Sequence, residues 1–117
     1  CGGGLHVGKT GRVIFSEFAS FEANSVRNGG QGGAVCNYGS LTFMRRSFFT
    51  GNVAYGRDSG AAGGGQGGAL FTGEGGRTTF VRKAIMHQNM AGTSGGALHN
   101  EGDTTFETSA FFGTNEA

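Results

Sequence analysis

The chain has 117 residues, enough for one domain, and a formal net charge of +1 at pH 7. Glycine supplies 26 residues, about three times its usual share, and proline and tryptophan are absent. This composition excludes collagen, which needs proline and a three-residue period, and the 11 phenylalanines argue against a disordered chain. Only 15% of the residues are charged, so no global field predicts a nucleic acid partner, and no apolar run is long enough for a transmembrane helix.

One pattern occurs four times along the chain. Each copy starts with a glycine pair and reaches a second glycine, which we call the frame glycine, seven to nine residues later. The pairs are Gly3-Gly4, Gly32-Gly33, Gly67-Gly68 and Gly95-Gly96, and the frame glycines are Gly11, Gly39, Gly76 and Gly102. Fixed internal spacing predicts a stack of equivalent units, each too small to bury its own apolar face.

Large side chains and asparagines keep a constant distance from the frame glycine. Four residues after it lie Phe15, Phe43, Phe80 and Phe106, and ten residues after it lie Phe21, Phe49, Met86 and Phe112. Thirteen residues after it lie Asn24, Asn52, Asn89 and Asn115. We expect the first phenylalanines to form one inward column. We expect the asparagines to form a structural ladder at a turn, because each amide can bond the equivalent amide of the next copy.

Within each copy the apolar residues alternate, which is typical of strands rather than helices. The glycine pair opens a first strand, residues 13–15 and 41–43 belong to a second, and residues 19–21, 47–49 and 110–112 to a third. The pattern predicts an all-β fold, a β-solenoid of about four coils with parallel strands in register. The coils span about 1–28, 29–63, 64–91 and 92–117 of a single domain, 1–117.

The motif Gly-Gly-Ala-Leu/Val followed by Phe-x-x-Asn resembles the repeat of the polymorphic outer membrane proteins of chlamydiae, also scattered through bacterial and algal surface proteins. It lies at residues 32–35 with 49–52, at 95–98 with 112–115, at 67–70 with 86–89, where Met86 replaces the phenylalanine, and, diverged, at 3–6 with 21–24. The resemblance covers essentially the whole chain and implies a right-handed parallel β-helix. It also implies an adhesin-like protein that is extracellular or at the cell surface, with an organelle lumen or the periplasm as the alternative.

Acidic residues do not form a catalytic pair in this frame. Right-handed β-helices include polysaccharide lyases and hydrolases, and glycoside hydrolysis needs two carboxylates about 5–10 Å apart. No aspartate or glutamate stacks on another in the repeat. We therefore predict a non-catalytic structural scaffold or interaction surface, not an enzyme, with no cofactor. The alternative is a carbohydrate-binding or polysaccharide-processing β-helix of the pectate-lyase type.

Basic residues recur at two positions of the frame. Arg45 and Arg82 lie six residues after their frame glycines, Arg46 and Lys83 lie seven after, and Glu17 shares the sixth position in the first copy. We expect the four cations to lie within reach of each other on one exposed face. Two interpretations stay open, a solvated turn with flexible side chains or a site for an anionic partner. That partner would be an acidic glycan, a lipid headgroup or an acidic protein surface.

Cysteine and histidine positions predict no metal site. Cys1 and Cys36 lie at different positions of the repeat, so a disulfide between them stays open but is not favoured, and His6, His87 and His99 share no column. Because Cys1 stands where an initiator methionine is expected, we expect a processed or trimmed chain or a fragment. Neither end resembles a cap, so we expect other protein chains stacked end-on, a larger assembly or a longer solenoid.

Overall fold

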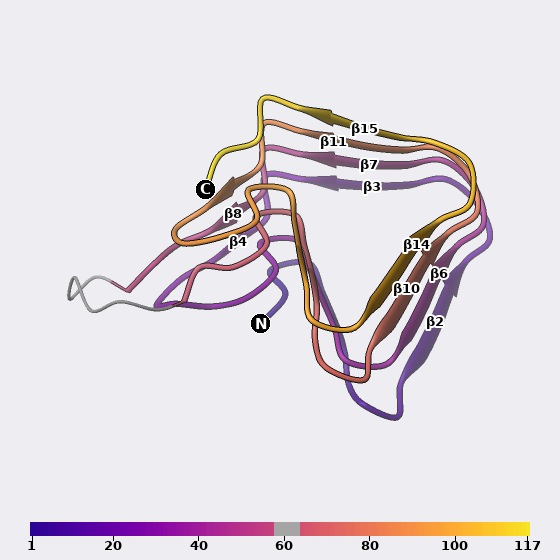
Figure 1. Ribbon diagram of the computed structural model, residues 1–117, viewed down its shortest axis with the longest axis horizontal. Coiled ribbons are helices and arrows are strands. Elements are labelled where there is room, and N and C mark those ends of the chain that lie inside the picture. The colour runs from indigo at the N-terminus through magenta and orange to yellow at the C-terminus, as the bar shows by residue number, and fades with distance from the viewer. Residues whose placement is uncertain (58–63) are drawn as a thin grey trace.

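The computed structural model describes residues 1–57 and 64–117, and within these ranges every regular element is a β-strand (Figure 1). Residues 58–63, at the end of the second predicted coil, lie outside these ranges. The chain passes through the same series of parallel sheets repeatedly, in the same order. The prediction of an all-β chain with stacked parallel strands is confirmed, and the arrangement is consistent with a β-solenoid. Across the described residues, no helix has the length and apolar character that a bilayer crossing requires.

Each sheet collects the equivalent strands of successive repeats. The first sheet contains β1 (Leu5–Val7), β5 (Val35–Asn37), β9 (Leu70–Thr72) and β13 (Leu98–Asn100). The second contains β2 (Arg12–Phe15), β6 (Ser40–Phe43), β10 (Arg77–Phe80) and β14 (Asp103–Phe106). The third contains β3 (Ala19–Glu22), β7 (Ser47–Thr50), β11 (Ala84–His87) and β15 (Ala110–Gly113). A shorter fourth sheet contains β4 (Ser25–Val26), β8 (Val53–Ala54) and β12 (Met90–Ala91).

The core lies between the sheets and is built from alternate residues of the strands. One register column contains Phe15, Phe43, Phe80 and Phe106, whose neighbouring rings stack with centroids 5.0, 4.9 and 4.8 Å apart. A second column contains Phe21, Phe49, Met86 and Phe112. Because strands in a sheet are about 4.8 Å apart, flat rings at successive levels meet at stacking distance.

A hydrogen-bonded column of asparagines, Asn24, Asn52, Asn89 and Asn115, follows the strands of the third sheet. The Nδ2 amide of each of the first three donates to Oδ1 of the next asparagine, at 3.0, 2.9 and 2.9 Å. The backbone N–H groups of the same three donate to the same oxygens, each at 3.0 Å. Asn52 and Asn89 are fully buried. Because an amide both donates and accepts, the two buried asparagines in the middle of the column satisfy all their side-chain polar atoms within the protein.

The first repeat begins at Gly2, one residue earlier than predicted. Leu5 pairs with Val35, and Gly2 has a φ of 70°, close to the 65° of the equivalent Gly32. A side chain at Gly32 would collide with the carbonyl oxygen of Val35, so this position requires glycine. Three consecutive glycines in the first repeat conceal which of them takes this place.

The corrected register changes which residues share a column. His6 pairs in register with Cys36, Cys36 with Phe71, and Phe71 with His99, so the four residues share one column. The prediction that His6 and His99 share no column was therefore wrong. Its cause is the one-residue error at the glycines that precede β1.

Inward side chains of the two outermost repeats are covered on one side only. Phe112 is 49% exposed and Phe15 and Phe106 are half-buried, whereas Phe43 and Phe80 in the middle repeats are buried. The difference follows from position in the stack, because each middle repeat packs against neighbours above and below it.

Candidate functional site

The turn between the second-sheet and third-sheet strands has three residues in every repeat. It comprises residues 16–18, 44–46, 81–83 and 107–109, which form the corner at the right of Figure 1. Backbone hydrogen bonds tie each turn to the next repeat on both sides. Val81 N donates to Phe43 O at 2.9 Å before the turn, and Ser47 N donates to Lys83 O at 3.1 Å after it. The four turns stay in register because they have the same length and because the residues on both sides of each turn are hydrogen-bonded to the neighbouring repeat.

Two rows of side chains therefore run across the repeats at this corner. The first row contains Glu17, Arg45, Arg82 and Thr108, and the second contains Phe18, Arg46, Lys83 and Ser109. Within each row, the backbone positions of neighbouring residues are about 4.8 Å apart, which is the distance between adjacent strands. All eight side chains are exposed. The structure thus brings the four predicted basic residues together on one face.

An open groove of about 930 Å³ is lined by both rows. Its lining comprises the eight residues of the rows together with Phe48 from β7. The groove thus draws on all four repeats, so its long direction crosses the strands. Four cations and one carboxylate give it an excess of positive charge.

The four basic side chains have no acidic partner in the described ranges. In this part of the chain Arg77 forms an ion pair with Asp103, at 3.8 Å, and His99 Nε2 lies 3.3 Å from Glu101 Oε1, both outside the groove. Glu17 shares the groove with Arg45 without forming an ion pair. Two like charges about 5 Å apart in water repel by about 1 kcal/mol, and more where the surroundings are less polar. The groove therefore carries positive charge that the described residues leave uncompensated.

Two phenylalanines supply an apolar part of the groove. Phe18 is 68% exposed, and its ring meets that of the half-buried Phe48 edge to face, with centroids 6.5 Å apart. Sequence reasoning missed both residues as part of a site. The available signal was a large apolar residue at an outward position of an alternating strand, which is where Phe48 lies in β7.

The predicted ladder residues lie elsewhere in the fold. The column of Phe15, Phe43, Phe80 and Phe106 belongs to the interior, and the asparagine column follows the third-sheet strands, at the end opposite the turn that lines the groove. Buried and hydrogen-bonded to each other, the middle asparagines have no free polar atom for a ligand. These residues position the groove rather than line it.

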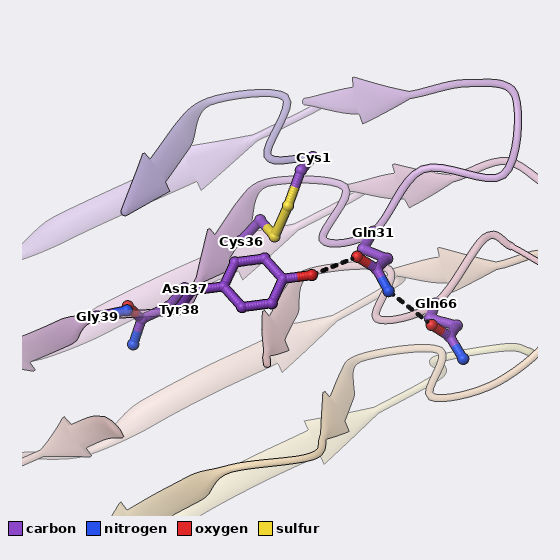
Figure 2. Close-up of a disulfide and its surroundings, with 7 residues drawn as sticks. All are labelled: Cys1, Gln31, Cys36, Asn37, Tyr38, Gly39 and Gln66. Atoms are coloured by element: carbon purple, nitrogen blue, oxygen red, sulfur yellow. Dashed lines mark hydrogen bonds between the residues drawn. A yellow bond between two sulfur atoms is a disulfide. The ribbon is translucent and has the colours of Figure 1, made fainter. Parts of the chain in front are cut away.

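A disulfide joins Cys1 to Cys36, with Cα atoms 5.5 Å apart (Figure 2). The pairing was not favoured from the sequence, and that interpretation is corrected here. Because the first repeat begins at Gly2, Cys1 occupies the position equivalent to Gln31 of the second repeat. From there its side chain reaches Cys36 in that second repeat. Ligand atoms of Cys1, His6 and Cys36 lie within 4.8 Å of one another, but the bonded sulfurs are not thiolates that could bind a metal.

Tyr38 lies beside this disulfide and covers the first sheet (Figure 2). Its hydroxyl donates to Gln31 Oε1 at 2.8 Å, and Gln31 Nε2 donates to Gln66 Oε1 at 3.1 Å. Burial raises the pKa of Tyr38, and the negative charge of Glu101 raises it further. Both effects favour the neutral form of the phenol, which donates this hydrogen bond.

The side chains of a serine, a histidine and a glutamate in the last repeat also form a chain of hydrogen-bond contacts. Ser94 Oγ is 2.9 Å from His99 Nδ1, and His99 Nε2 is 3.3 Å from Glu101 Oε1. Such an order could polarise a serine hydroxyl. The neighbouring groove of about 560 Å³ is lined by Glu101 and Tyr38 but by neither Ser94 nor His99, so the hydroxyl does not face that space.

Comparisons with known proteins were made for the whole chain. No protein-family model, no curated protein and no solved structure matches it. A function for this protein is therefore proposed from the geometry and chemistry of the groove.

Proposed function

We propose that this protein is a non-catalytic repeat protein whose basic groove is an interaction surface for an anionic partner. The observation that carries the proposal is the convergence of Arg45, Arg46, Arg82 and Lys83 on one open groove without an acidic partner among the described residues. An anion between the rows would offset the repulsion between neighbouring levels. Arginine is suited to this task, because its planar fork binds carboxylate, sulfate or phosphate through two hydrogen bonds.

The scaffold that carries the groove is, in this proposal, a right-handed parallel β-helix of four coils. The repeated order of the sheets and the in-register columns support it, as does the resemblance to the polymorphic outer membrane protein repeat. The disulfide supports an oxidising compartment, whether extracellular, at the cell surface, in an organelle lumen or in the periplasm. An adhesin-like role fits a rigid scaffold that presents a charged surface.

Other protein chains stacked end-on are the partners we propose for the two end faces. The last repeat leaves Phe111 and Phe112 about half exposed, next to the unpaired edge of β15. Exposed aromatic surface beside a strand edge favours pairing with another chain. Phe112→Glu should then lower self-association in sedimentation experiments at high protein concentration. A wild-type chain that stays monomeric at every concentration would contradict this partner.

Polysaccharide processing is the second candidate function. A smaller groove, about 430 Å³, lies on the outer face of β10 and β14 and contains Asp103 and Glu107. The two residues are four apart along an extended segment, so their Cα atoms are roughly 13 Å apart. A carboxylate pair for inverting hydrolysis needs about 6.5–9.5 Å, and Asp103 is already paired with Arg77. This geometry favours binding over hydrolysis.

The test compares two variants with the same net charge. In the groove variant, Arg45, Arg46, Arg82 and Lys83 are replaced by Gln, and in the control variant Lys9, Arg12, Arg27 and Arg57 are replaced by Gln. Each loses four positive charges, which takes the formal net charge from +1 to −3. Retention on a sulfonated resin is measured in a salt gradient, with circular dichroism as the check on folding.

We expect the groove variant to elute at much lower salt than the control variant, because clustered charges bind a polyanion together. Equal elution of the two variants would show that net charge alone controls retention, and the proposed function would then fail.

A further inference from the structure

The shape of the groove restricts its ligand to an extended one. The lining comes from the equivalent turn of all four repeats, so the groove runs across the strands, along the direction in which repeats stack. Three strand spacings make this path roughly 14 Å long. A linear molecule lying along it would meet a new pair of side chains at each level.

Charge is concentrated in the middle of this path. The second and third repeats supply the four cations, whereas the first supplies Glu17 and Phe18 and the fourth supplies Thr108 and Ser109. A ligand matched to the groove therefore needs anionic groups beside the second and third repeats and uncharged groups beside the first and fourth. A ligand with charge at every position would bring one of its anions close to Glu17.

Aromatic and hydroxyl side chains point to a sugar chain. Phe18 presents most of its ring to solvent at one end of the cationic rows, where it can pack against the hydrocarbon face of a pyranose. Thr108 and Ser109 can exchange hydrogen bonds with sugar hydroxyls at the other end. In addition, one monosaccharide of an extended polysaccharide is about as long as the separation of adjacent strands.

We propose that the groove binds a linear acidic polysaccharide along the stacking direction, with carboxylate or sulfate groups held by Arg45, Arg46, Arg82 and Lys83 and a sugar ring packed on Phe18. This inference rests on the proposed function, whose anion-binding surface it assigns to one class of polymer. A lipid surface fits less well, because Glu17 at one end and Thr108 and Ser109 at the other end interrupt the cations, whereas an anionic bilayer presents charge on all sides. A nucleic acid backbone carries a phosphate at every nucleotide and would bring one of them close to Glu17.

The test measures binding of the folded, disulfide-bonded chain by calorimetry at low salt. The probes are acidic oligosaccharides of two to six sugars that carry carboxylate or sulfate groups on two adjacent sugars and are neutral beyond them, neutral oligosaccharides of the same lengths, polyglutamate and vesicles with anionic lipid. We expect acidic oligosaccharides to bind, with affinity rising up to about three or four sugars and then levelling, because the groove spans roughly 14 Å. Neutral sugars should not bind measurably.

Two variants separate sugar recognition from charge attraction. Phe18→Ser should weaken binding of the acidic oligosaccharides about tenfold while leaving polyglutamate binding unchanged. Ile14→Ser is the matched control, because Ile14 is also an exposed apolar residue of the first repeat, 52% exposed, but lies outside the groove, and it should change neither. The four-residue groove variant should lose both kinds of binding.

Each alternative outcome identifies what fails. If polyglutamate or anionic vesicles bind through the groove and acidic oligosaccharides do not, the polysaccharide assignment is overturned and the anionic interaction surface stands. If Phe18→Ser binds every probe as the wild type does, sugar-ring recognition is overturned. If no anionic probe binds at low salt, both this inference and the proposed function fail.

Discussion

Two columns of stacked polar residues lie at opposite ends of the third-sheet strands, and they behave in opposite ways. The asparagines at one end are joined to each other by hydrogen bonds of 2.9–3.0 Å, and the middle two are buried. The arginines and lysine at the other end are exposed and unpaired within the described residues. An amide donates and accepts, whereas a guanidinium or ammonium group only donates. The same stacking geometry therefore stabilises the fold in one column and concentrates exposed positive charge in the other.

The largest expected effect comes from breaking the asparagine column in its middle. Asn52→Ala removes an acceptor for Asn24 and donors to Asn89 Oδ1 and the carbonyl of Phe21. Since each unsatisfied buried group costs about 1–3 kcal/mol, the free energy of unfolding should fall by about 4 kcal/mol. Denaturant titration measures the loss.

A matched change at the end of the same column provides the control. The side chain of Asn24 donates only to Asn52 Oδ1, so Asn24→Ala should cost about 1 kcal/mol. If the two substitutions had equal cost, the column would not be stabilised by its own hydrogen bonds.

The second effect concerns the first repeat, which supplies Asn24 to the asparagine column and Glu17 and Phe18 to the groove. The disulfide closes a sequence separation of 35 residues, for which loop-closure entropy predicts about 3–4 kcal/mol of stabilisation. Cys1→Ser should lower the free energy of unfolding by about that amount, and a dithiol reductant should lower the wild type to the same level. A wild-type protein whose unfolding midpoint is unchanged by the reductant would contradict the role assigned to this bond.

A smaller effect of opposite sign is expected from the basic rows. Replacing Arg45, Arg46, Arg82 and Lys83 by Gln removes repulsion between exposed charges, so stability should rise by up to about 1 kcal/mol. Added salt should stabilise the wild type more than this variant, because screening weakens the repulsion. Thermal unfolding at two salt concentrations makes the comparison, and a destabilised variant would show that the rows support the fold.

The smallest effect is a pH dependence on the first sheet. Burial, followed by Glu101, raises the pKa of Tyr38, so its neutral form contributes stability that is present below the unfolded pKa and is lost as pH rises through the folded pKa. In a Tyr55→Phe background, phenolate absorbance reports Tyr38 alone. Glu101→Gln should shift its titration to lower pH, and an unchanged titration would remove Glu101 as a cause.

The sequence by itself determined the second-sheet and third-sheet strands and the repeat positions of the four basic residues, but not the short strands of the fourth sheet. This was possible because the turn between the second-sheet and third-sheet strands has the same length in every repeat, so counting from Gly39 and Gly76 places Arg45 beside Arg82. Alternation with period two also separates inward from outward side chains within a strand. Local spacing carries this information without any long-range contact.

Only the tertiary structure decided where the first repeat begins, which cysteines pair and how the groove is lined. The glycines before β1 give no side-chain pattern to count, and the backbone pairing of Leu5 with Val35 resolves them. The disulfide depends on that one-residue shift, because it brings Cys1 to the level at which Cys36 can be reached. The contact between Phe18 and Phe48 depends on how the side chains of neighbouring repeats pack. These residues are 30 apart in the sequence and belong to different repeats, so the spacing within one repeat does not predict that they touch.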